Sequence, residues 1–209
     1  MTPKIIEIVG EEPLTVAECR QHIEAQPYGD SELDPLDDAQ IEGMLAAARE
    51  HCENFLGLSL STRTLEIALD QFPCVRRQPH QHRDLAIELP MGPVRQVLSI
   101  SWGDESDDEM NDDTFTLDDY SRPARVTPVS AAWPAVTRAT NAVKIRYLAG
   151  YGVDSDGGQP LPKAIRAAIL LVLGHLYANR EDAADVALTS LPINAEALMR
   201  PLRVRLGMA

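Results

Sequence analysis

Apolar residues recur with a helical period in three separate parts of the chain. In the second and clearest part they follow the spacing i, i+3, i+4, i+7, i+11, i+14 and i+15, which places them on one face of an α-helix. Asp37 or Asp38 is the expected N-cap of this helix, and Gly57 supplies its stop. The positions on the predicted buried face are Ile41, Met44, Leu45, Ala48, Cys52, Phe55 and Leu56.

A capping box marks the start of an earlier helix. Thr15 is a good N-cap residue, and Glu18 stands three positions later, where its carboxylate can accept a hydrogen bond from the Thr15 backbone N–H. We expect this helix to end near Gln26, because Pro27 and Gly29 follow. Its short apolar stripe consists of Val16, Cys19 and Ile23.

The third helical segment begins at Pro162, a favoured first-turn residue, and is expected to run to about Asn179. Arg166 interrupts its apolar run, which is shorter than the roughly 20 residues that a membrane span needs. Leu170 and Leu171 lie outside the core stripe, so we expect this helix either at the centre of the fold or between subunits. The core stripe consists of Ile165, Ile169, Val172, Leu173 and Leu176.

The hydrophobic period changes to two in the middle of the chain, between residues 61 and 147. Turns that contain proline or glycine separate the alternating runs, which we interpret as half-buried strands. In one run we expect Val94, Leu98, Ile100 and Trp102 to share a face. The runs cover residues 64–72, 84–89, 94–102, 114–117 and 142–147.

These patterns together predict an α+β protein with two parts. Residues 1–60 and 148–209 are expected to form a small helical bundle that ends in a C-terminal tail. Residues 61–147 are expected to form a small antiparallel β module inserted between the helices.

Charge is unevenly distributed along the 209 residues, whose net charge is −13. Residues 160–209 hold six basic and four acidic residues, so the preceding 159 residues carry a net charge of −15. An acidic body of this kind repels phosphates, and we therefore expect no sequence-specific binding to nucleic acid. A protein that surrounds DNA without gripping it is compatible with this charge.

Three widely spaced cysteines, Cys19, Cys52 and Cys74, form no C-x-x-C pair. Their odd number and spacing predict reduced thiols in a cytosolic environment, with Cys19 and Cys52 at helix core positions. The first residues contain neither a basic region nor a long apolar run, so we expect no secretory signal peptide.

Two segments carry residue types that bind metals. The acidic segment Gly103–Asp113 lacks the EF-hand spacing with its central glycine and final glutamate, and is expected to be a solvated loop between strands. Cys74, His80 and His82 are candidate zinc ligands, but a structural zinc site needs four, and no second ligand pair exists. We therefore expect no metal and no cofactor.

The segment Gly150–Gly158 begins like a phosphate-binding G-x-G-x-x-G motif, but Ser155 stands in place of the third glycine. Pro160 and Pro162 also remove backbone N–H groups from the approach to the next helix, where a phosphate would bind. We interpret the segment as a turn. The sequence contains no P-loop, G-x-S-x-G or H-E-x-x-H motif, which disfavours catalysis.

The order and spacing of these segments resemble the head–tail connector (adaptor, or head-completion) family of long-tailed double-stranded DNA bacteriophages, in the subgroup with a β insertion. The resemblance extends from about Glu12 to Val204. Its most specific parts are AAR-x-x-C-E-N-F-L-G, which begins at Ala47, and K-A-I-R-A-A-I-L-L-x-x-x-H-L-Y-x-N-R-E, which begins at Lys163.

The resemblance implies a structural virion protein that is not an enzyme. Such a protein would be assembled in the host cytoplasm and located in the virion neck, as a ring, expected to be a dodecamer, below the portal protein. The ring would extend the channel through which double-stranded DNA passes without sequence-specific binding. It would also provide the attachment surface for a tail-side stopper or tail-terminator protein, and no membrane would be involved.

The resemblance also implies that the C-terminal segment Ala195–Ala209 contacts the portal. Apolar residues would anchor this contact and arginines would add polar interactions. A frayed terminus is the alternative interpretation of the same segment. Leu170 and Leu171 are the expected subunit–subunit contacts. The expected portal-binding residues are Leu198, Arg200, Leu202, Arg203, Val204, Arg205 and Leu206.

The sequence leaves two alternatives open. One is a metal-dependent binding module or enzyme that uses the acidic segment or Pro79–His82. The other is a small regulator that binds a partner through its helices. Bound metal would favour the first of these alternatives.

Overall fold

The structure, a computed structural model, describes residues 2–24, 37–74, 85–103, 108–130, 132–137, 139–152, 158–179 and 192–204. The chain divides into a β unit (residues 1–10, 57–158 and 204–209) and a helical unit (residues 11–56 and 159–203). The predicted α+β class is confirmed. Residues 61–147, the expected insert, all lie in the β unit, which extends further in both directions.

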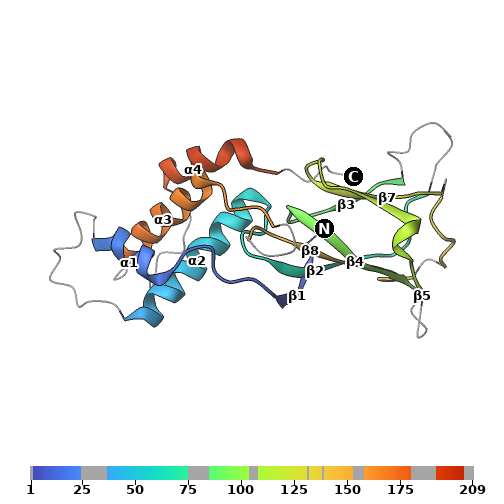
Figure 1. The fold of residues 1–209 in the computed structure, drawn as a ribbon, viewed down its shortest axis with the longest axis horizontal. Helices are drawn as coiled ribbons and strands as arrows, with labels where there is room; N and C mark the ends of the chain where they lie inside the picture. The colour runs from blue at the N-terminus through green and yellow to red at the C-terminus, as the bar shows by residue number, and fades with distance from the viewer. Residues whose placement is uncertain are drawn as a thin grey trace. The chain divides into compact units, whose positions relative to one another are not determined.

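The described part of the helical unit consists of four α-helices and one short 3₁₀ turn. Helix α3 packs against each of the other three helices, and α2 also contacts α1 and α4 (Figure 1). The predicted first, second and third helices are therefore present, while α4 was not predicted. The elements are α1 (Val16–Glu24), α2 (Asp38–Leu56), α3 (Lys163–Ala178), α4 (Ile193–Met199) and η4 (Arg200–Leu202).

Local sequence signals explain where these helices begin and end. The Thr15 backbone N–H donates to Glu18 Oε2 at 3.0 Å, and the Glu18 backbone N–H donates to Thr15 Oγ1 at 3.3 Å, which confirms the capping box. Asp37 and Gln40 form a second reciprocal pair, with distances of 2.8 and 3.1 Å, so Asp37 is the cap of α2. Gly57 follows α2 with φ +68, as expected for a helix stop.

Helix α2 buries an arginine together with a carboxylate partner. Arg49 and Glu53 are only 5 % and 3 % exposed, and Arg49 Nη1 donates to Glu53 Oε2 at 2.8 Å. Arg49 Nε also donates to Glu12 Oε2 at 2.9 Å, which ties the segment before α1 to α2. Removing a charge from water is costly, so this cluster is stable only while its opposite charges stay together.

We expect Arg49→Met to destabilise the protein by about 3–5 kcal/mol, because it removes the cation that offsets the buried Glu53 carboxylate. The double variant Arg49→Met/Glu53→Leu should recover most of this loss. Urea denaturation followed by far-UV circular dichroism measures both effects. A double variant that is less stable than the single one would contradict this account of the cluster.

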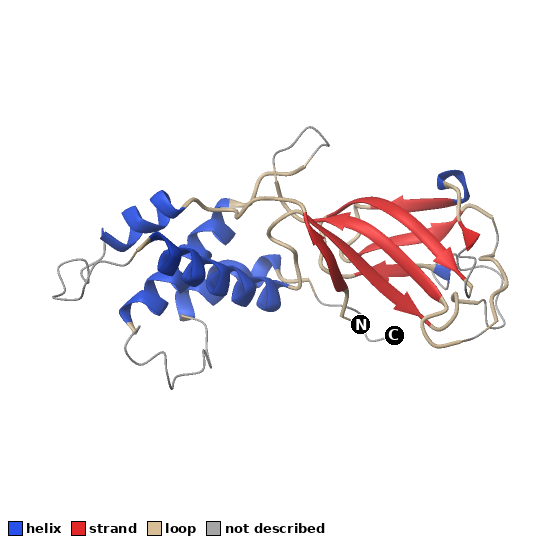
Figure 2. Ribbon diagram, turned by 90° about the horizontal axis from the view of Figure 1, so that it is seen from below, coloured by secondary structure: helices blue, strands red, loops and turns tan. Residues whose placement is uncertain are grey.

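The described part of the β unit contains two antiparallel sheets, drawn in red in Figure 2, whose apolar side chains share one core. The larger sheet has the order β1-β2-β8-β4-β5 and the smaller sheet has the order β3-β7-β6. The strands are β1 (Lys4–Ile8), β2 (Arg63–Leu69), β3 (Ile87–Leu89), β4 (Val94–Trp102), β5 (Asp108–Glu109), β6 (Phe115–Asp118), β7 (Ala124–Pro128) and β8 (Val143–Ala149).

The buried face of β4 differs from the predicted one. Val94, Val97 and Ile100 are buried, whereas Leu98 is 43 % exposed. The expectation that Leu98 shares a face with Val94 and Ile100 is therefore wrong. The register between β4 and β8 shifts twice along this stretch, and each shift adds a residue that turns the following side chains to the other face.

Strands β1, β5 and β7 and helix α4 escaped the sequence patterns. Strand β5 lies within Gly103–Asp113, so the expectation that this whole segment is a loop is wrong there. Strand β1 has isoleucines on both faces and therefore shows no alternation, and all five of its residues are exposed. Strand β7 is short and ends at a proline, which hides its period of two. Helix α4 has seven residues, too few for a helical period to stand out.

The backbone is crowded where β1 and β8 end and β2 begins. Gly150 has φ +117, and a Cβ at this position would collide with the Ser61 carbonyl oxygen. On the other side, a Cβ at Gly10 would lie 2.8 Å from Thr62 Cβ. Val9 and Gly10 both donate their backbone N–H groups to the Thr62 carbonyl oxygen, at 3.0 and 2.8 Å. Glycine is required here because no side chain fits.

We expect Gly150→Ala to lower the free energy of unfolding by at least about 1–3 kcal/mol, since alanine at this φ is strained even before the clash is counted. Gly43→Ala is the matched control, because Gly43 lies on α2 with nothing near its Cβ position. The control should stabilise the protein by roughly 0.5–1 kcal/mol through helix propensity. Chemical denaturation checks both values, and equal effects would contradict the crowding argument.

Candidate interaction surfaces

The first half of the C-terminal segment is part of the folded helical unit. Ala195 and Met199 of α4 are completely buried, and α4 packs on α3 and α2. The start of Ala195–Ala209 is therefore packed into the helical unit and is not a frayed terminus. Within the described residues, the side chains of this segment that remain accessible are those on the outer surface of α4 and η4 and at residues 203 and 204.

Three of the expected portal-binding residues lie on that outer surface. Leu198 is 38 % exposed, Arg200 is exposed, and Leu202 is half-buried. Arg200 Nη2 forms a salt bridge with Glu196 Oε1 at 2.9 Å within the same helical stretch. Ile193, at the start of α4, is a highly exposed apolar residue that the sequence reasoning did not single out.

Arg203 is exposed as well, but it also contacts α2. The Arg203 guanidinium carbon lies 4.9 Å from the centre of the Phe55 ring, a cation–π contact that ties η4 to α2. Val204 is half-buried. Arg205 and Leu206 lie outside the described residues. Arg203 therefore has a structural role within the helical unit, whatever else it contacts.

Helix α3 keeps apolar surface outside its core stripe. Leu170 and Leu171, the expected subunit–subunit contacts, are half-buried, whereas Ile169 and Val172 beside them are completely buried. Leu176, expected in the core stripe, is also only half-buried. The apolar area left on Leu170 and Leu171 is available to another surface. Cys19 and Cys52 fill the core of the helical unit, as predicted.

Arg166, the residue that interrupts the apolar run of α3, joins α3 to α1. Its guanidinium forms a salt bridge with the Glu18 carboxylate and donates to the Pro13 carbonyl oxygen at 3.3 Å. The hydrogen bond from the Thr15 backbone N–H, together with the Thr15 hydroxyl and Arg166, lowers the pKa of Glu18. Arg166 thus has a structural role in the otherwise apolar stretch 164–174 of α3.

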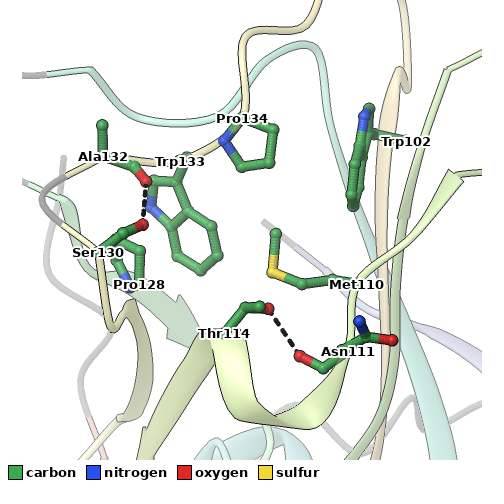
Figure 3. A pocket seen from close by; sticks show the side chains of 9 residues that line it. All are labelled: Trp102, Met110, Asn111, Thr114, Pro128, Ser130, Ala132, Trp133 and Pro134. Carbon is green, nitrogen blue, oxygen red and sulfur yellow. Dashed lines mark hydrogen bonds between the residues drawn. The ribbon is translucent and has the colours of Figure 1, made fainter.

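A pocket of about 370 Å³ opens in the β unit (Figure 3). The Trp133 ring on its wall stacks on Phe72, with ring centres 4.9 Å apart, and its Nε1–H donates to the Leu85 carbonyl oxygen at 2.7 Å. The hydroxyl groups at the pocket donate to nearby backbone carbonyl oxygens, as the dashed lines in Figure 3 show. The lining residues are Trp102, Met110, Asn111, Thr114, Pro128, Ser130, Ala132, Trp133 and Pro134.

The lining residues include no histidine, cysteine or carboxylate, so none of them could act as a base toward the Thr114 or Ser130 hydroxyl. Across the described part of the chain, no three histidine, cysteine or carboxylate residues lie together in a way that could hold a metal. Cys74 is exposed, while His80, His82 and part of Gly103–Asp113 lie outside the described residues. No helix in the described ranges is long and apolar enough to cross a membrane.

Strand β1 forms an exposed sheet edge that the sequence reasoning missed. It pairs with β2 on one side, and its other side has no strand partner within the described residues. Ile5 is 49 % and Ile8 is 63 % exposed, so the edge carries apolar side chains next to open backbone groups. Such edges readily pair with another strand. The β-branched residues of the segment were the available sequence signal.

Comparisons with solved structures show that the fold is shared over the full length of the chain. A chain from the virion of a native gene transfer agent particle matches with a TM-score of 0.73 and 24 % identity. Chains from the neck of an empty particle, computed with C6 symmetry, and of a native particle, computed with C12 symmetry, match with TM-scores of 0.72 and 0.68 and 22 % identity. Each match covers 100 % of this chain and 99 % of the other. No protein-family model and no curated protein matches the sequence.

We expect Glu18→Gln to lower stability at neutral pH by at most about 0.5–1 kcal/mol, a value kept small because the carboxylate is partly exposed. The folded-state pKa of Glu18 is depressed, so its contribution is present above the unfolded-state pKa and is lost as the pH falls through the folded-state pKa. The two proteins should therefore converge in acid. Thermal unfolding between pH 7 and pH 3 measures the difference, and a gap that widens toward acid would contradict the assignment.

Proposed function

We propose that this protein is a structural subunit of the neck of a phage-like particle, where copies of it form a ring between head and tail. The full-length fold match carries this proposal, because both units of the chain are included in it. Two of the matched chains belong to necks computed with sixfold or twelvefold symmetry. A ring of identical subunits is the simplest way to meet such symmetry.

Within the neck, we assign the protein the role of a head–tail connector, or adaptor, that sits below the portal. The ring, proposed as a dodecamer, would extend the DNA channel and offer its far side to a stopper or tail-terminator protein. The net charge of −13 supports a channel component, because an acidic wall does not retain passing DNA. The half-buried Leu170 and Leu171 supply apolar area for contact between copies.

The proposed portal contact uses the outer surface of α4 and η4. Leu198, Arg200 and Leu202 place two apolar side chains and one cation there. Arg205 and Leu206 would extend the contact beyond the described residues. The alternative of a metal-dependent module or enzyme rests on Gly103–Asp113 and Pro79–His82, and no specific observation favours it.

Electron microscopy of this protein mixed with portal rings from the same particle tests the function. We expect an added ring at one end of the portal, with matching rotational symmetry. The portal contact is tested separately with Leu198→Asp/Arg200→Glu, which should weaken co-sedimentation with the portal by about tenfold or more. Point variants are needed because deletion from Ala195 would remove buried core residues.

Glu42→Lys is the matched control, since Glu42 is an exposed charged residue on α2. It should leave co-sedimentation unchanged. Equal binding by the Leu198→Asp/Arg200→Glu variant would disprove the α4–η4 contact while leaving the ring intact. If wild-type protein adds no density to the portal, the connector role itself is wrong.

A further inference from the structure

The pocket of the β unit brings together both tryptophans of the chain. Trp102 is the last residue of β4, and Trp133 lies in the segment after β7. In Figure 3 the Trp102 ring is seen nearly edge-on, opposite Trp133 and Pro134, so one of its faces is turned toward the space between them. The volume of about 370 Å³ is at the lower end of the range for ligand pockets and is large enough for a single side chain.

Phe72 holds the two indole rings in place. It stacks on Trp133, and its ring meets the Trp102 ring in an edge-to-face arrangement with ring centres 6.0 Å apart. The hydrogen bond from Trp133 Nε1–H to the Leu85 carbonyl oxygen fixes the Trp133 ring further. The aromatic wall is therefore preorganised, and a ligand that stacks on it does not have to order these rings.

Two hydroxyl groups at the pocket are available as hydrogen-bond acceptors. Thr114 Oγ1 donates to the Asn111 carbonyl oxygen at 2.6 Å, and Ser130 Oγ donates to the Ala132 carbonyl oxygen at 2.9 Å. A hydroxyl has one proton and two lone pairs, so in this arrangement each oxygen can accept a further hydrogen bond but not donate one. These oxygens therefore fit a ligand that donates, and arginine and lysine side chains are donors with no acceptor.

One wall of the pocket belongs to a strongly acidic part of the sequence. Asn111 lies in Gly103–Asp113, which holds seven acidic residues and no basic one. Asp113 is exposed in the short 3₁₀ turn η2 (Asp112–Thr114), directly before the lining residue Thr114. A residue next to a lining residue lies within the roughly 8–10 Å over which charges act at physiological salt. The lining residues themselves include no arginine or lysine, so the local charge favours a cation.

The rim of the pocket offers further surface to a protein partner. Thr114 and Ser130 are exposed on the rim, and Val129, the apolar neighbour of Ser130, is 64 % exposed. A partner surface that inserts one side chain into the pocket can cover these residues, whereas a free small cation would leave Val129 in water. An anchor side chain in a pocket, surrounded by a rim that excludes water, is the usual form of a binding hot spot.

We propose that this pocket binds an arginine side chain presented by a partner protein. The guanidinium packs against the indole rings, and its N–H groups donate to the hydroxyl oxygens of Thr114 and Ser130. Arginine fits better than lysine because the guanidinium is planar, stacks on aromatic faces and is more weakly hydrated than an ammonium group. The inference goes beyond the proposed neck function and does not depend on it, since every lining residue belongs to the β unit.

Tryptophan fluorescence of the full chain tests the proposal, because both tryptophans lie at the pocket. The probes are N-acetylarginine amide and N-acetylcitrulline amide, which have nearly the same shape but differ in charge. We expect the arginine probe to change the emission with a dissociation constant at least about tenfold lower than that of the citrulline probe. Equal constants, or no response to the arginine probe, would overturn the proposal.

Two further probes separate the other classes of ligand. Tighter binding of N-acetylproline amide or of methyl glucoside than of the arginine probe would show that the pocket takes a neutral ring, and it would overturn the proposal. Tighter binding of free arginine than of its N-acetyl amide would indicate an amino-acid ligand and would overturn the docking of a protein segment. Neither result would affect the proposed neck function.

A pair of charge variants tests the electrostatic part of the argument. Asp113→Asn, just before β6, should raise the dissociation constant of the arginine probe by about two- to fivefold. Asp119→Asn is the matched control, because it removes the same charge from an exposed residue just after β6. The control should leave the constant unchanged, and equal effects of the two variants would contradict the local attraction of a cation.

Discussion

The close approach of three backbone segments at the start of β2 is the constraint on which the β unit depends. Residues Gly10, Ser61 and Gly150 come so near one another that two of these positions have no room for a side chain. The hydrogen bonds to the Thr62 carbonyl oxygen hold the end of β1 in place there. Arg95 reinforces the same region by donating to the carbonyl oxygens of Gly150 and Gly152. Three of the four junctions between the two units are glycines, at residues 10, 57 and 158.

The sequence was informative where structure is set by neighbours in the chain. The capping pairs at Thr15 and Asp37 depend on residues three positions apart, and both helix starts were predictable from them. The face of β4 depends instead on its register with β8, which no local pattern encodes, and so Leu98 was misplaced. Strand β1 becomes a strand because β2 pairs with it, and an isolated run of isoleucines does not reveal that partner.

Some residues of the candidate surfaces were predictable from the local sequence, and others were not. The sequence identified Leu170 and Leu171 as surplus to the core stripe, and the structure leaves both half-buried. Arg203, which the sequence predicted to bind a partner, is exposed and also lies over Phe55 within the same unit, a contact that the sequence did not reveal. Arg49 likewise connects α2 to the segment before α1, and Arg166 connects α3 to α1. The contacts of these arginines depend on how the helices pack, and that packing is visible only in the folded arrangement.

The pairing of Arg63 with Ala149 places the two ends of the long segment between them side by side. Adjacent strands are separated by only about 5 Å, a distance that one or two residues can bridge. An insertion with neighbouring ends can be gained, lost or exchanged without stretching the chain on either side of it. The segment between residues 63 and 149 thus leaves and rejoins the rest of the chain at one place in the sheet, and any replacement for it would have to keep a partner strand for β1.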